Sequence, residues 1–67
     1  MTKTYNLIFN DGTEIITGVK AETCEEAEQY FVEHLHRMFQ EMDPKAEWSQ
    51  KDTIRENIRK DYYIIKK

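Results

Sequence analysis

The chain has 67 residues and a formal net charge of −3. A chain of this length forms a single domain, residues 1–67, and buries only about 60% of the surface that the unfolded chain exposes. Its one cysteine excludes an intramolecular disulfide and favours a reducing compartment, so we expect a cytoplasmic protein. No apolar run has the length of a signal sequence or a membrane span, which argues against a membrane partner.

Two β-rich runs, residues 5–10 and 14–21, predict a β-hairpin, because the Asp11–Gly12 dipeptide between them tolerates the positive φ angles of a tight turn. Gly18 inside the second run predicts a bulge or a close approach of another backbone. In the first run, one face holds Tyr5, Leu7 and Phe9. In the second run, one face holds Ile15, Thr17, Val19 and Ala21, and the other holds Ile16 and Gly18.

The segment Thr23–Asp43 predicts the helix around which the rest of the chain packs. Thr23 and Glu26 fit a capping box at the helix start. Pro44 ends the helix, because the residue before a proline avoids the α region. The apolar residues recur at steps of three and four, as on one face of an α-helix. They are Ala27, Phe31, Leu35, Met38 and Met42.

The residues after Pro44 predict a short turn that carries Ala46 and Trp48, followed by a second helix from about Gln50 to Arg59. An S-x-x-D pattern beginning at Ser49 marks the start of this helix. Its apolar residues at helical spacing are Ile54 and Ile58.

The β-branched and aromatic run Tyr62–Ile65 predicts a closing strand. The predicted fold class is α+β, a three-stranded, mainly antiparallel sheet packed by one long helix, with a second, shorter helix at one edge or end and the order β-β-α-α-β. The expected core comprises Tyr5, Leu7, Phe9, Ile15, Val19, Ala27, Phe31, Leu35, Met38, Ile58 and Ile64.

The apolar arc of the long helix is wider than the stripe that one sheet covers. Phe31 and Leu35 lie at the centre of this arc. Tyr30 and His34 form a first wing, and Val32 and Phe39 form a second wing. One wing therefore needs another cover, either the second helix, a second copy of the chain or a foreign protein. The predicted partner or dimer interface comprises Tyr30, Val32, His34, Phe39, Trp48 and Tyr63.

No motif indicates a catalytic site, a metal site or a cofactor, and we expect no enzyme. Cys24 stands at the first helical position, where the helix dipole activates a thiol, but the sequence marks no base beside it, so it is expected on the buried face. His34 and His36 are two residues apart on a helix and cannot share one ion. His34 is expected to flank the core and His36 to face solvent.

Charge is distributed unevenly along the chain. The first 50 residues carry a net charge of −6, and the last 17 carry +3. Acidic residues on and just before the long helix predict a partner-binding face, and they are Glu22, Glu25, Glu26, Glu33 and Glu41. Basic residues interleaved with aromatics in the last segment are typical of nucleic-acid binding. They are Lys51, Arg55, Arg59, Lys66 and Lys67.

Three functions follow as hypotheses. The leading one is a small, acidic, non-enzymatic protein-binding module, an inhibitor or adaptor that binds through its acidic helix face and exposed aromatics. In size, acidity and compact α+β order the chain resembles the small inhibitors carried by phages, such as anti-CRISPR proteins, a resemblance that involves no specific motif. The alternatives are a homodimeric structural protein and a nucleic-acid-binding module that uses the basic C-terminal segment.

Overall fold

The first two strands form the predicted hairpin in a computed structural model that describes all 67 residues. Strand β1 spans Lys3–Phe9 and strand β2 spans Glu14–Ala21. The turn is closed by Gly12 N–H donating to Phe9 O at 2.9 Å, and by Phe9 N–H donating to Thr13 O at 2.8 Å. Gly12 has a φ of +92°, a conformation that favours glycine. Gly12 therefore acts as the sequence predicted, whereas Asp11 does not adopt a positive φ and instead accepts the N–H of Thr13 at 2.9 Å through its side chain.

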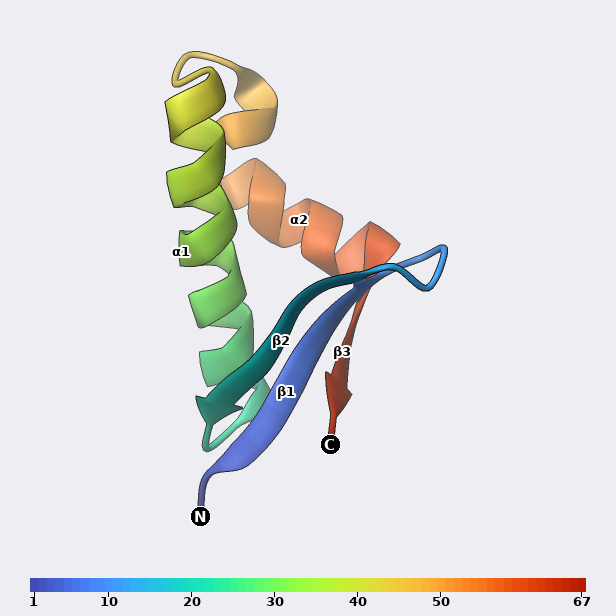
Figure 1. Cartoon of the computed structure of the whole chain (residues 1–67). Coiled ribbons are helices and arrows are strands. Elements are labelled where there is room, and N and C mark those ends of the chain that lie inside the picture. The colour runs from blue at the N-terminus through green and yellow to red at the C-terminus, as the bar shows by residue number, and fades with distance from the viewer.

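Helix α1 spans Cys24–Met42 and begins with the predicted cap (Figure 1). Glu26 N–H donates to Thr23 Oγ1 at 3.2 Å, which satisfies one of the amides left free at a helix start. The Glu26 carboxylate accepts the N–H of Glu22 at 3.2 Å instead of the N–H of Thr23, so the second bond of the predicted capping box is made one residue earlier. The helix ends at Met42, and its C-cap Asp43 is extended and directly precedes Pro44, in keeping with the predicted stop.

A 3-10 turn, η1, spans Glu47–Ser49, and helix α2 spans Lys51–Asp61. The second helix predicted from about Gln50 to Arg59 is confirmed, but Ser49 does not cap it, because the N-cap of α2 is Gln50, which makes no side-chain cap bond. Ser49 is instead fully buried, and its hydroxyl donates to Ala46 O at 2.7 Å. Strand β3, Tyr62–Lys66, follows α2 with no intervening loop.

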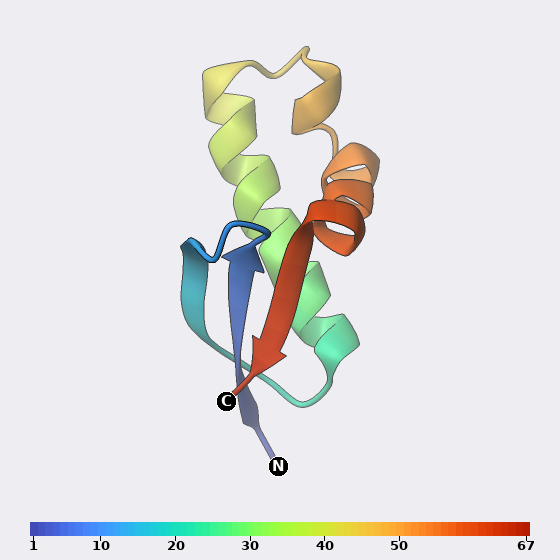
Figure 2. The ribbon, with the colours of Figure 1, turned by 90° about the vertical axis from the view of Figure 1, so that its right-hand side faces the viewer.

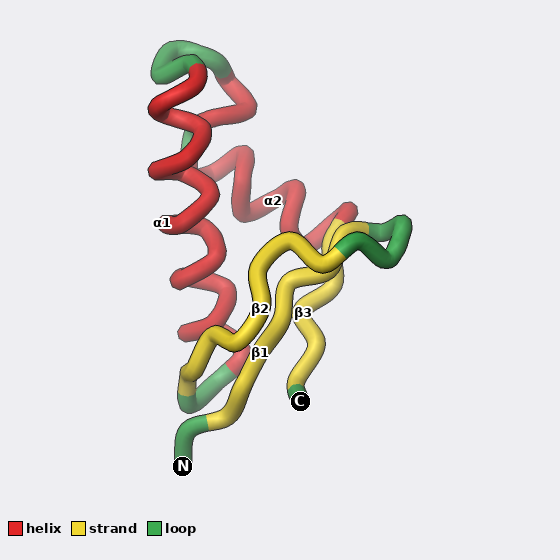
Figure 3. The backbone as a smooth tube through the Cα atoms, in the orientation of Figure 1, coloured by secondary structure: helices red, strands yellow, loops and turns green.

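The three strands form one antiparallel sheet in the order β2-β1-β3, so the first strand is central and the two edges are β2 and β3 (Figures 2 and 3). The element order β-β-α-α-β, the antiparallel three-stranded sheet and the α+β class agree with the fold expected from the sequence. Helix α1 packs against one face of the sheet, and α2 packs beside α1 and leads into β3 (Figure 1).

A bulge in β2 overturns the predicted face of that strand. Tyr5 pairs with Val19 but Leu7 pairs with Ile16, so β2 has one extra residue across from β1. Gly18 lies in this bulge with a φ of +75°, and its N–H donates to the side chain of the buried Asn6 at 2.9 Å. The shift turns Ile16 towards the core and leaves Ile15 exposed, the reverse of the prediction.

The core lies between the sheet, α1 and α2. Its ten buried apolar residues are Tyr5, Leu7, Val19, Ala21, Ala27, Phe31, Val32, Leu35, Ile54 and Ile58. Of the expected core residues, Ile64 is half-buried against the core, and Phe9 is half-buried against the ring of Tyr62. Met38 was expected in the core but is exposed, because this part of α1 extends past the sheet (Figure 1).

Candidate interaction surface

The C-terminal half of α1 is not covered by the sheet. The 19 residues of α1 make a helix about 28 Å long, and the strands run away from it towards the hairpin end (Figure 1). Helix α2 and η1 cover one side of the exposed half, and the other side is open to solvent (Figure 2). On this half of α1, apolar residues that face α2 and η1 are therefore buried, and those on the other side are exposed.

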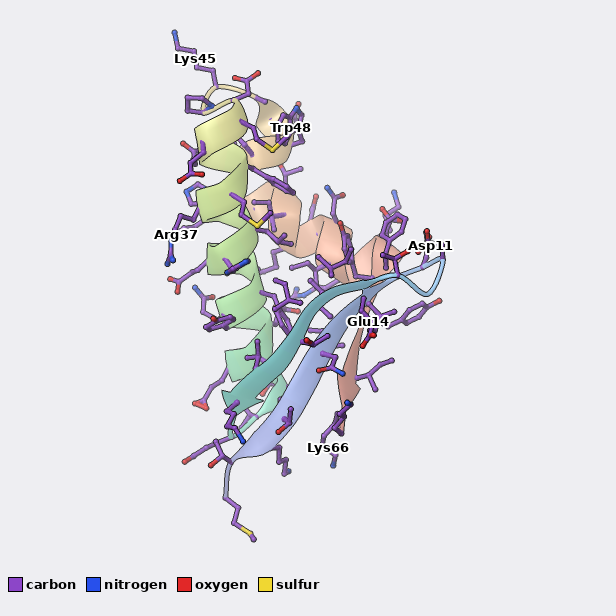
Figure 4. The ribbon with its side chains drawn as sticks, in the orientation of Figure 1. Asp11, Glu14, Arg37, Lys45, Trp48 and Lys66 are labelled. Atoms are coloured by element: carbon purple, nitrogen blue, oxygen red, sulfur yellow. The ribbon has the colours of Figure 1, made fainter.

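The second wing is covered by the chain itself. Val32 is fully buried, so it cannot meet a partner. Phe39 is half-buried, and its ring meets the ring of Trp48 edge-on at a centroid distance of 5.2 Å. Trp48 remains 42% exposed and lies beside the C-terminal end of α1 (Figure 4).

Polar contacts attach η1 to α1 and hold Trp48 in this position. His36 Nδ1 lies 2.9 Å from Ser49 O. The Gln40 side-chain amide donates to Ser49 O at 3.3 Å and to Ser49 Oγ at 3.2 Å. The prediction that His36 faces solvent is therefore wrong, since the ring is half-buried against η1.

The first wing is open and continues along the helix. Tyr30 is 51% exposed, His34 is half-buried, Met38 is 46% exposed and Met42 is 71% exposed. Each of these four residues is four positions from the next, so they form one row on the helix surface. The rings of Tyr30 and His34 stack at a centroid distance of 6.2 Å and an interplanar angle of 13°. We call these four residues the α1 ridge.

A shallow hollow of about 100 Å³ lies on the outer flank of the ridge and is lined by Tyr30, Glu33, His34 and Arg37. All four side chains come from α1, and Arg37 points away from the sheet (Figure 4). The hollow is part of the helix surface and has no second wall.

The predicted acidic face divides into two groups with different surroundings. Glu22 and Glu26 take part in the helix cap, and Glu25 lies in the first turn, where carboxylates stabilise the helix dipole. Glu33 accepts a hydrogen bond from the Gln29 side chain at 3.3 Å, and Glu41 is exposed. Glu33 and Glu41 flank the α1 ridge, and Glu26 lies four positions before Tyr30, at the N-terminal end of the same row.

Two of the five predicted basic residues make contacts within the chain. Arg59 donates to both Glu28 oxygens, with Nη2–Oε1 at 2.9 Å and Nε–Oε2 at 3.0 Å. This carboxylate raises the pKa of Arg59. Arg55 donates to the Gln29 side chain at 2.9 Å and lies 3.8 Å from Glu28. These two arginines attach α2 to α1, while Lys51, Lys66 and Lys67 are exposed.

A second group of exposed apolar residues lies on the face of the sheet opposite α1. Tyr63 pairs with Ile8 of β1 and is exposed, and Ile65 pairs with Asn6 and is also exposed. Lys66 neighbours them at the end of β3, far from Trp48 (Figure 4). Tyr63 thus belongs to a surface separate from the α1 ridge, although the sequence grouped it with Trp48.

Cys24 is a free, exposed thiol, contrary to the expectation that it packs on the buried face of the helix. No three His, Cys, Asp or Glu side chains gather closely enough to share a metal ion. None of the helices has the length and apolar character required to cross a membrane.

Comparisons with protein-family models, curated proteins and solved structures find no match to this chain.

Proposed function

We propose that the chain is a non-enzymatic protein-binding module, an inhibitor or adaptor of the kind that phages carry, and that it contacts its partner through the α1 ridge and Trp48. The observation that carries this proposal is the exposure of three large apolar side chains in one place, Met38, Met42 and Trp48. Folding alone does not require these residues to be apolar, because they contribute little to the core.

The three side chains belong to one surface. Met38 and Met42 are one turn apart on α1, and Met42 is three positions from Phe39, whose ring contacts Trp48. Methionine and aromatic residues are enriched at the centres of protein interfaces, and the flexible thioether of methionine adapts to different partner shapes. Contiguous exposed apolar surface on a small domain is typical of an interaction site.

The test is capture of partners from a lysate of the cells in which the chain is naturally made. The wild-type protein is compared with Met38→Gln/Met42→Gln, which removes apolar surface from the ridge. Glutamine retains a good helix propensity, so the variant should keep the wild-type circular dichroism spectrum and melting temperature. The matched control is Tyr63→Gln/Ile65→Gln, which removes apolar surface from the opposite face of the sheet.

We expect the wild type and the control variant to retain the same proteins and the ridge variant to lose them. Retention of no protein by the wild type would contradict the proposal. Retention of the same set by the ridge variant would place the binding surface elsewhere.

A second candidate is a homodimeric structural protein that uses the same ridge. A row of residues four positions apart packs well against an identical row, which gives a two-fold contact between helices. Sedimentation at increasing concentration tests this candidate. A mass that rises from one chain to two, and does not rise for Met38→Gln/Met42→Gln, supports the dimer, whereas a constant mass of one chain contradicts it.

A further inference from the structure

We infer that the partner presents a basic amphipathic helix to the α1 ridge, with its cationic side chains near the C-terminal end of α1. This inference rests on the proposed function and specifies the chemistry of the partner. It follows from the charges around the ridge, the electrostatics of the helix end and the shape of the exposed row.

Acidic groups outnumber basic groups around the ridge and Trp48. The charged residues on the flank of α1 and in the segment leading to Trp48 are Glu33, Arg37, Glu41, Asp43, Lys45 and Glu47. All six are exposed, and four of them are carboxylates. Lys45 extends away from the body of the protein (Figure 4), which leaves the acidic groups to dominate the border of the ridge. Such a border favours a cationic partner and opposes an anionic one.

The end of α1 adds a further negative contribution. The free carbonyl groups at a helix C-terminus carry a partial negative charge, which basic residues in the last turn normally offset. The last turn of α1 contains no basic residue. Glu41 lies in that turn, and the C-cap residue is Asp43. A lysine or arginine of a partner would supply the positive charge that this helix end lacks.

The exposed row selects a helical partner. Tyr30, His34, Met38 and Met42 follow the i, i+4 spacing that fits into the groove between rows of another helix. The row spans thirteen residues, or twelve steps and about 18 Å of helix, which is enough for three or four turns of a crossing helix to make contact. An extended strand would instead require a free sheet edge, and α1 provides none.

Trp48 is the only tryptophan and borders the ridge, so its fluorescence reports binding directly. The probe is a tryptophan-free peptide of about 16 residues with leucine at helical spacing and lysine elsewhere. A first control peptide replaces every lysine with glutamate. A second keeps the leucines and lysines but alternates them, which removes the apolar face of the helix.

We expect the basic amphipathic peptide to shift Trp48 emission to shorter wavelength and to gain helical circular dichroism, in a saturable manner that weakens with added salt. Neither control peptide should do so. Met38→Gln/Met42→Gln should weaken binding about tenfold or more, Glu41→Gln/Glu47→Gln should weaken it at low salt, and Tyr63→Gln/Ile65→Gln should leave it unchanged.

Equal binding of the acidic peptide, or a response that the ridge variant retains, would overturn the inference. Suppose that the ridge captures proteins from the lysate, but that the basic peptide neither binds to the ridge nor displaces those proteins. In that case the inference fails while the proposed function stands. If concentration-dependent dimerisation buries Trp48 without peptide, the occupant of the ridge is a second copy, and the inference is also overturned. Absence of both peptide binding and ridge-dependent capture removes both proposals.

Discussion

Gly18 shows how one residue sets the face of a whole strand. Its φ of +75° is unfavourable for other residues, while nothing lies within 4 Å of the position that a side-chain Cβ would occupy. A substitution there is therefore opposed by backbone strain and not by crowding. The bulge that this conformation permits directs Ile16 towards the core and Ile15 towards solvent.

We predict that Gly18→Ala destabilises the protein by about 1–2 kcal/mol, the usual cost of a left-handed conformation for a residue with a Cβ. Urea unfolding followed by circular dichroism measures this loss. The neighbouring exposed substitution Thr17→Ala is the control and should cost less. A Gly18→Ala variant as stable as the wild type would show that the bulge is not held in this conformation.

Tyr62 makes the stability of the folded protein depend on pH in the alkaline range. Burial of the phenol, followed by the nearby charge of Asp61, raises the pKa of Tyr62 above its usual value of 10.0. The folded state therefore favours the neutral phenol more than the unfolded state does. The resulting contribution to the stability of the folded state is complete below pH 10 and is lost as the pH rises through the folded-state pKa of Tyr62.

We predict a fall in melting temperature above pH 10 that is smaller in Tyr62→Phe than in the wild type. The phenylalanine ring retains the edge-on contact with Phe9, whose centroid distance is 5.0 Å for the native tyrosine, but it has no proton to lose. Thermal melts from pH 8 to pH 11 measure the difference. Parallel curves for the two proteins would contradict the assignment to Tyr62.

At the level of elements, Glu28 joins the two helices. Its carboxylate is largely buried and accepts two hydrogen bonds from Arg59. We predict that Glu28→Gln and Arg59→Gln each lower the melting temperature, and that the double variant loses less than the sum of the two changes, because both remove the same interaction. Denaturation in low and high salt should show a smaller effect of Glu28→Gln in high salt. Additive losses would show that the two side chains act independently.

The order and type of the elements could be predicted from the sequence because each depends on nearby residues. The Thr23 cap, the Asp11–Gly12 turn and the stop at Pro44 are local signals, and each acts as expected in the structure. The assignment of Ile15 and Ile16 was wrong because a bulge shifts the register by one residue, and Gly18 alone could not distinguish a bulge from a close approach.

The candidate surface could be predicted only in part. The width of the apolar arc on α1 correctly indicated that the sheet would not cover it all. Which wing stays open depends on the position of α2 and η1, a tertiary property that no local pattern encodes. Met38 was assigned to the core because helical spacing does not show how far a sheet extends along the helix. The role of Glu28 was missed because its partners lie in a distant segment.

For the molecule as a whole, the small core leaves little reserve of stability. Domains have about 0.05–0.15 kcal/mol of stability per residue, which gives roughly 3–10 kcal/mol for this chain. Phe31 is fully buried, and its truncation to alanine costs about 3–5 kcal/mol. We predict that Phe31→Ala is substantially unfolded at 37 °C, as measured by circular dichroism. Met42→Ala, at an exposed position, should retain the wild-type stability within about 0.5 kcal/mol.

The central position of β1 has a consequence for the order of folding. Its partner β2 is adjacent in the sequence, but its partner β3 is the last strand, and Tyr5 pairs with Lys66 across nearly the whole chain. Contacts of such long range are costly to form early. The hairpin and α1 are therefore expected to assemble first and β3 to dock last. In stopped-flow experiments, Ile64→Val should accelerate unfolding and leave the folding rate almost unchanged.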